Sequence, residues 1–224
     1  RVLFRSIPGD WIVAILLSGF ILLAWNHVFN PGRFLQVLRA AFSRRYVNQL
    51  IREGNLFTER IAITMIILYL ITISLLLYLI NHRITGIRPE MVAGWMLYLF
   101  ILAGLAIYIF AKVFLIIVLG KIFKTKEATY HYLLNMLIIA ALTAPLMLFL
   151  LVLLVYIPKN ALFFITLALL AVVMIIRFVR GFLIGSEFTK FSHLLLFVYL
   201  CSLEILPLLV LIKTVMIYAN PAVL

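Results

Sequence analysis

The chain has 224 residues, of which 67% are hydrophobic and 12% are charged, whereas soluble domains contain about 45–50% and about 25% of these classes. This composition and a mean hydropathy of +1.26 exclude a water-soluble monomer. A net charge of +12 is also found in nucleic-acid-binding proteins, but here the basic residues follow membrane sidedness, so we expect no nucleic-acid partner.

Six apolar runs are each long enough to cross a hydrocarbon core of about 30 Å as a helix that rises about 1.5 Å per residue. They cover residues 11–29, 61–80, 91–118, 133–156, 160–183 and 194–218. The sequence therefore predicts an all-α protein, a polytopic membrane helix bundle with six transmembrane helices in one transmembrane domain over residues 1–224. Because the chain begins with Arg1 rather than Met, we expect further residues upstream.

Residues 33–52, between the first two runs, predict an amphipathic helix at the membrane interface with a bend near residues 43–45. Its docking residues would be three apolar and three basic side chains: Phe34, Leu38, Phe42, Arg39, Arg44 and Arg45. Two roles are open for this segment. It is either a docking surface or lipid-headgroup platform on the anionic cytoplasmic leaflet, or a connector that lies flat in the interface.

The basic residues predict the orientation of the chain. Thirteen of the nineteen Lys and Arg residues lie in or beside the connections between spans one and two, three and four, and five and six. Five lie on the opposite side: Arg1, Arg5, Arg83, Arg88 and Lys159. Because cytoplasmic loops carry the excess of positive charge, the sequence predicts that both termini face the periplasm.

Glu204 lies about eleven residues into the last apolar run, where an ionised carboxylate costs at least about 2.5–3.5 kcal/mol. Pro207 follows it and leaves the carbonyl of Leu203 without its helical partner. By helical rise, the long side chains of Arg177 and Lys112 could reach Glu204 from neighbouring spans. The carboxylate would then belong either to a structural ion pair or to a substrate or proton pathway, and no second intramembrane carboxylate is present to build a relay.

The sequence contains no recognisable catalytic or metal-binding pattern. His27, His131 and His193 are expected at the cytoplasmic ends of three spans, but none has the i, i+4 spacing of a helical chelate, so we expect no metal, haem or other cofactor. The only cysteine, Cys201, excludes a disulfide framework and a thiolate metal cluster. Serine and threonine hydroxyls occur without a neighbouring base, so we expect no nucleophilic catalysis.

Three stretches carry a resemblance to a known family. These are Leu-Glu-Ile-Leu-Pro at residues 203–207, Asn-Pro-Gly-Arg-Phe at residues 30–34 with the Arg44-Arg45 pair, and the span that begins at Trp11. Together they resemble an uncharacterised family of Bacteroidota inner-membrane proteins that is classed as a domain of unknown function. The resemblance implies a polytopic helical fold in a bacterial inner membrane and brings no activity.

The leading hypothesis is a non-enzymatic subunit or accessory of a larger inner-membrane assembly, with the lipid bilayer and other membrane-protein subunits as its partners. The alternative is a small proton-coupled or solute transporter, in which Glu204, the break at Pro207 and a kink at Pro145 line a path. A membrane-embedded enzyme on lipid or prenyl substrates is a third hypothesis, against which the missing acidic metal-binding motif counts.

Overall fold

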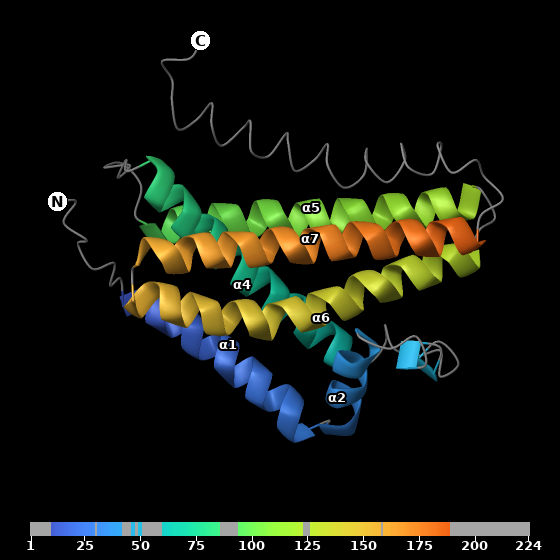
Figure 1. Ribbon diagram of the computed structural model, residues 1–224, viewed down its shortest axis with the longest axis horizontal. Helices are drawn as coiled ribbons and strands as arrows, with labels where there is room; N and C mark the ends of the chain where they lie inside the picture. Colours follow the sequence, from blue (N-terminus) through green and yellow to red (C-terminus); the bar gives the residue numbers. More distant parts are fainter. Residues whose placement is uncertain are drawn as a thin grey trace, which may run out of the picture. The chain divides into compact units, whose positions relative to one another are not determined.

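The computed structural model describes residues 10–29, 31–41, 46–47, 49–50, 60–85, 94–122, 126–157 and 159–188. All of these residues are helical except Ala41, Ile157 and Lys159, so the predicted all-α class is confirmed for this part of the chain. The long elements (Figure 1) are α1 (Asp10–Phe29), α2 (Pro31–Ala40), α4 (Arg60–Thr85), α5 (Gly94–Ile122), α6 (Lys126–Tyr156) and α7 (Asn160–Phe188).

Five of these helices are long and apolar enough to cross a membrane. The candidate spans are Asp10–Phe29, Ile61–Arg83, Gly94–Ile122, Thr129–Tyr156 and Asn160–Gly181. They overlap the first five predicted apolar runs, whereas the predicted sixth span, residues 194–218, lies outside the described residues. The chain is therefore a multi-pass helical membrane protein whose apolar helices contact the lipid bilayer.

The described residues group into two compact units. Unit 1 combines α1, α2, the first part of α4 through residue 77, and residues 136–174 of α6 and α7. Unit 2 combines the end of α4, all of α5, residues 126–135 of α6, and α7 from residue 175 onward. Each of α4, α6 and α7 thus supplies residues to both units.

The helix α1 buries one face and exposes the other, although it is apolar on both. Its buried residues are Ile12, Leu16, Gly19 and Asn26, and their spacing in multiples of three and four residues is that of a helix-packing seam. The opposite face is exposed, with Leu17 56% and Ile21 63% accessible. In a membrane this second face meets lipid, so both faces can be hydrophobic.

Gly19 allows α1 to pack closely in unit 1. A Cβ atom at this position would lie 2.8 Å from Cδ1 of Leu148 on α6 and 3.7 Å from Cδ1 of Leu68 on α4. One residue further along α1, the rings of Phe20 and Phe149 meet edge to face with centroids 5.8 Å apart. The small residue therefore creates the space that the Leu148 side chain fills.

A hydrogen bond joins α1 to α4. The hydroxyl of Thr64 donates to Oδ1 of Asn26 at 2.6 Å, and Nδ2 of Asn26 donates to the carbonyl of Leu22 in its own helix at 3.0 Å. Asn26 is only 1% exposed, so both polar atoms of its amide are satisfied inside the protein. Such hydrogen bonds between spans contribute about 0.6 kcal/mol on average and at most about 1.7.

Four buried serine and threonine hydroxyls in the spans bond to their own helices. The side chains of Thr72, Ser74, Thr143 and Thr166 each donate to the backbone carbonyl four residues earlier, at 2.6–2.9 Å. These polar residues can therefore lie within apolar helices without a partner on another helix.

The packing at Gly19 predicts the effect of a larger side chain. Gly19→Leu should lower the free energy of unfolding by about 1–3 kcal/mol, because the new side chain must displace the buried Leu148. Ala14→Leu is the matched control, since Ala14 lies on the exposed face of the same helix and its substitution should change stability by less than about 0.5 kcal/mol. Equal unfolding free energies in detergent for the two variants would contradict the described packing.

Candidate functional site

Two polar side chains are buried in unit 2 within otherwise apolar helices. Lys112 of α5 is 4% exposed and Asn135 of α6 is 5% exposed. Polar groups buried at membrane depth are costly and are commonly functional. The sequence predicts Lys112 as a partner for Glu204, but Asn135 is not among the predicted site residues. Its position near the start of the run 133–156 was the available signal, because that run is otherwise almost entirely apolar.

The helical hairpin of α5 and α6 brings Lys112 and Asn135 to one depth. Only three residues separate these helices, and a Cβ atom at Gly120 would overlap the side chain of Thr129, so the two helices run antiparallel and pair at this point. From this pair, Lys112 is about 12 Å along α5 and Asn135 about 9 Å along α6, at about 1.5 Å per residue. The two side chains thus differ by about 3 Å in height.

The side-chain oxygen of Asn135 has no hydrogen-bond partner among the described residues. Its Oδ1 is fully buried and accepts no hydrogen bond from any residue that the structure describes. Leaving such an acceptor unsatisfied costs about 1–3 kcal/mol. A group that carries N–H or O–H, such as water or a hydroxyl or acid group of a ligand, would remove this cost. Lys112 and Asn135, which we call the polar pair, are therefore the candidate intramembrane site.

The structure places only part of the predicted ion pair. Lys112 lies on α5 and Arg177 on the part of α7 that belongs to unit 2, where it is half-buried. Neither residue is without an interaction partner. Glu204 and Pro207 lie outside the described residues, so contact between Glu204 and either cation stays a prediction.

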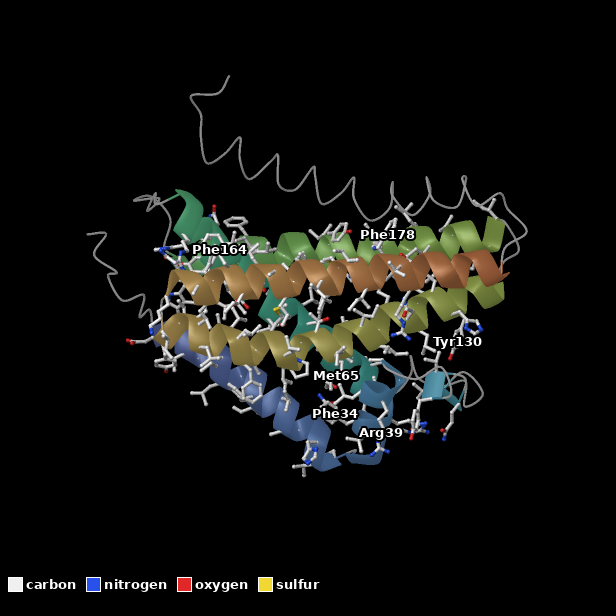
Figure 2. All side chains as sticks on the ribbon, viewed as in Figure 1. Phe34, Arg39, Met65, Tyr130, Phe164 and Phe178 are labelled. Carbon is white, nitrogen blue, oxygen red and sulfur yellow. The ribbon has the colours of Figure 1, made fainter. Side chains whose placement is uncertain are left out.

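The predicted interfacial segment is represented by α2 (Figure 2), which begins at Pro31 and ends at Ala40. Phe34, Val37 and Ala40 are buried in unit 1, and the ring of Phe34 meets that of His27 edge to face with centroids 6.2 Å apart. Phe34 is therefore covered within the chain and is not an accessible docking residue.

The other docking residues of the sequence analysis fall into two groups. Leu38 is half-buried, and Arg39 is exposed on the opposite side of α2 from Phe34. Phe42, Arg44, Arg45 and the predicted bend near residues 43–45 lie outside the described residues. The exposed surface of α2 thus contains Arg39 together with Gly32 and Leu35.

The histidines do not assemble within the described residues. His27 lies in unit 1 and His131 in unit 2, while His193 lies beyond the described part of α7. In the described ranges no three His, Cys, Asp or Glu side chains come together in a group that could hold a metal ion.

Comparison with known proteins identifies the family. A family model described as "Domain of unknown function (DUF4271)" matches residues 12–215. The chain belongs to the DUF4271 family. The matched range includes all of α2, α4, α5, α6 and α7, and with them the polar pair, so these features lie within the family's domain. No curated protein and no solved structure matches the chain.

Substitution by leucine should change the free energy of unfolding differently at the two buried asparagines. Asn135→Leu should leave the free energy of unfolding unchanged or raise it by up to about 1–3 kcal/mol, because it removes an unsatisfied acceptor. Asn26→Leu should lower it by about 0.6–1.7 kcal/mol, because it removes the bond from Thr64. Thermal or denaturant unfolding in mild detergent measures both, and a large loss of stability in Asn135→Leu would show that its amide is satisfied.

Proposed function

We propose that the chain is a non-enzymatic subunit or accessory of a larger assembly in a bacterial inner membrane. The observation that carries this proposal is a surface of α5, which we call the α5 seam. Its residues recur at alternating steps of four and three and therefore share one helical face: Phe100, Gly104, Ile107, Ala111 and Phe114. All five are exposed, with Phe100 71%, Ile107 69% and Phe114 58% accessible.

The side chains of the α5 seam alternate between large and small. The phenylalanines and Ile107 are separated by Gly104 and Ala111, and a Cβ atom at Gly104 would have no heavy atom within 4 Å. Small residues let a second helix approach closely, and large residues on either side then fit into its grooves. Lipid chains do not require this alternation, so the pattern favours a transmembrane helix of another subunit as the occupant.

The burial of whole helices supports the same interpretation. The percentages of buried residues were compared over an apolar stretch of 18 residues in each span. In α4 and in α6, 56% of these residues are buried, compared with 17% in α5 and 11% in α7. The helices α5 and α7 thus present wide apolar surfaces to their surroundings. Lipid can cover such area, but a subunit of an assembly would place part of it against neighbouring helices.

The charge distribution supports an orientation for this subunit. We propose that six spans, including residues 194–218, place both termini in the periplasm and α2 at the cytoplasmic surface. The basic cytoplasmic face, including the exposed Arg39, would then be available to soluble domains of partner subunits.

Substitution of Gly104 tests the subunit proposal. Gly104→Leu should fold normally, because the Cβ position opens into free space, but it fills the hole that the partner helix needs. Overpacking of about 1–3 kcal/mol corresponds to a loss of affinity of about fivefold to more than a hundredfold. The measurement is the amount of co-purifying chains per copy of tagged protein after extraction in mild detergent.

Ala14→Leu is the control for this experiment, because it adds the same side chain to an exposed position on α1. It should retain the co-purifying chains in stoichiometric amount. Equal retention in both variants would show that the α5 seam is not the binding surface, and a wild-type protein that purifies alone would contradict the subunit proposal.

The polar pair favours the transporter as the second candidate. A buried lysine and an unsatisfied amide at one depth could bind a proton-carrying or anionic solute, with Glu204 as the proton carrier. Uptake into proteoliposomes that is lost in Asn135→Leu and Glu204→Gln, with the fold intact, would favour this function over the subunit role.

A further inference from the structure

The exposed side of α7 has the same residue spacing as the α5 seam. Among the five candidate spans, α5 and α7 are the least buried. Along α7, residues at alternating steps of four and three share one helical face: Ala161, Ile165, Ala168, Val172 and Ile175. All five are exposed, with Ile165 54%, Val172 53% and Ile175 62% accessible. We call these residues the α7 seam.

The two seams are complementary in the size of their side chains. When they are paired in chain order, a small residue of one helix lies opposite a larger residue of the other in four successive layers. The layers are Phe100 with Ala161, Gly104 with Ile165, Ile107 with Ala168, and Ala111 with Val172. The fifth layer brings together two large side chains, Phe114 and Ile175. Equivalent positions of two such seams face each other when the helices are parallel, so four of five layers fit closely.

The membrane topology makes this parallel pairing possible between two copies of the chain. A single span, α6, separates α5 from α7 in the chain, so these two helices cross the membrane in the same direction. Copies that are inserted in one orientation therefore present α5 and α7 to each other as parallel helices. Within one copy the members of both seams are exposed, so each seam is available to a neighbour.

The paired residues also lie at nearly the same depth. Ile107 is one residue before the middle of the span Gly94–Ile122, and Ala168 is two to three residues before the middle of the span Asn160–Gly181. At about 1.5 Å per residue, the two positions differ in depth by about 2 Å. Moving one helix by a heptad would misalign the spans by about 10 Å.

We propose that the α5 seam of one copy packs against the α7 seam of a second copy of this chain. The proposal rests on the subunit role and names the neighbour at the α5 seam. Pairing of α5 with α5 fits less well, because parallel copies of this helix place Phe100 opposite Phe100 and Gly104 opposite Gly104. The bulky layers would hold the helices apart and leave empty space at the glycines.

The proposed contact joins two different faces of the chain. Each copy uses α5 toward one neighbour and α7 toward another, so the contact links copies head to tail into a ring or an open row. Because association follows mass action, dilution of the purified chain in excess lipid separates the copies and exposes both seams.

Cysteine cross-linking between two variants tests the proposal. A tagged chain with Ile107→Cys and an untagged chain with Ala168→Cys, each in a Cys201→Ser background, carry one cysteine apiece. They are expressed together and oxidised in native membranes. We expect the mixed disulfide dimer to be several-fold more abundant than the dimer that either variant forms with itself, because the proposed contact places these two positions in one layer.

Val179→Cys in place of Ala168→Cys is the matched control for depth. Val179 is also exposed on α7, but it lies eleven residues, or about 16 Å, further along the helix. Its mixed dimer with Ile107→Cys should be several-fold less abundant.

An exchange of side-chain size tests the packing itself. Gly104→Leu should reduce the recovery of untagged copies with a tagged copy by about fivefold to more than a hundredfold. Ile165→Ala in the same chain should restore the recovery, because the larger side chain on α5 then meets a smaller one on α7. Leu17→Ala, which shortens an exposed side chain on α1, should not restore it.

Three results would overturn the proposal. Self-dimers of Ile107→Cys as abundant as the mixed dimer would show that α5 pairs with α5. Failure of Ile165→Ala to restore the recovery would show that the α7 seam is not the occupant. If Gly104→Leu releases other proteins but no untagged copy is recovered with the tagged wild-type chain, the α5 seam binds a different protein and the subunit role stands. A tagged chain that recovers no other chain at all would contradict both proposals.

Discussion

The packing of α1 in unit 1 depends on two side chains that contribute almost no hydrophobicity. Gly19 leaves the volume that Leu148 occupies, and Asn26 accepts the hydrogen bond from Thr64. Hydrophobic attraction cannot select a face in lipid, because both faces of the helix are equally apolar to their surroundings. Close approach and an interhelical hydrogen bond supply the selection, and they hold Ile12 and Leu16 inside while Leu17 and Ile21 face outward.

Close helix packing at a small residue also bears on the α5 seam. Both α1 and α5 carry a glycine among large residues at three- and four-residue steps, but the space beside Gly19 is filled by Leu148 and the space beside Gly104 is open. One seam is therefore used within the chain, while the other has comparable geometry and no occupant among the described residues. A partner helix would complete the second seam as α6 completes the first.

The approximate position of five spans could be predicted from the sequence, because apolar runs of about 20 residues have few alternatives in a membrane protein. Which faces lie inside could not be predicted, since apolar residues surround α1 and α5 on all sides. Phe34 illustrates the difficulty: the amphipathic pattern placed it on an apolar face that was expected to lie in the membrane interface, whereas its ring is buried in unit 1 and contacts His27 at the end of α1. Asn135 was missed because a single amide in an apolar run resembles a residue that bonds to its own helix, and only the structure shows its Oδ1 to be unsatisfied.

If the chain is a subunit, the α5 seam is covered by another chain in the native membrane. Spin labels at Ile107 on α5 and at Leu17 on α1, each in a Cys201→Ser background, measure this directly through their collision rates with dissolved oxygen. The protein should be extracted with its native neighbours in polymer-bounded membrane discs and compared with the purified chain in lipid. We expect oxygen access at Ile107 to be low in the native discs and high in the purified chain, with Leu17 high in both. Equally high access at Ile107 in both preparations would show that no other chain covers the α5 seam.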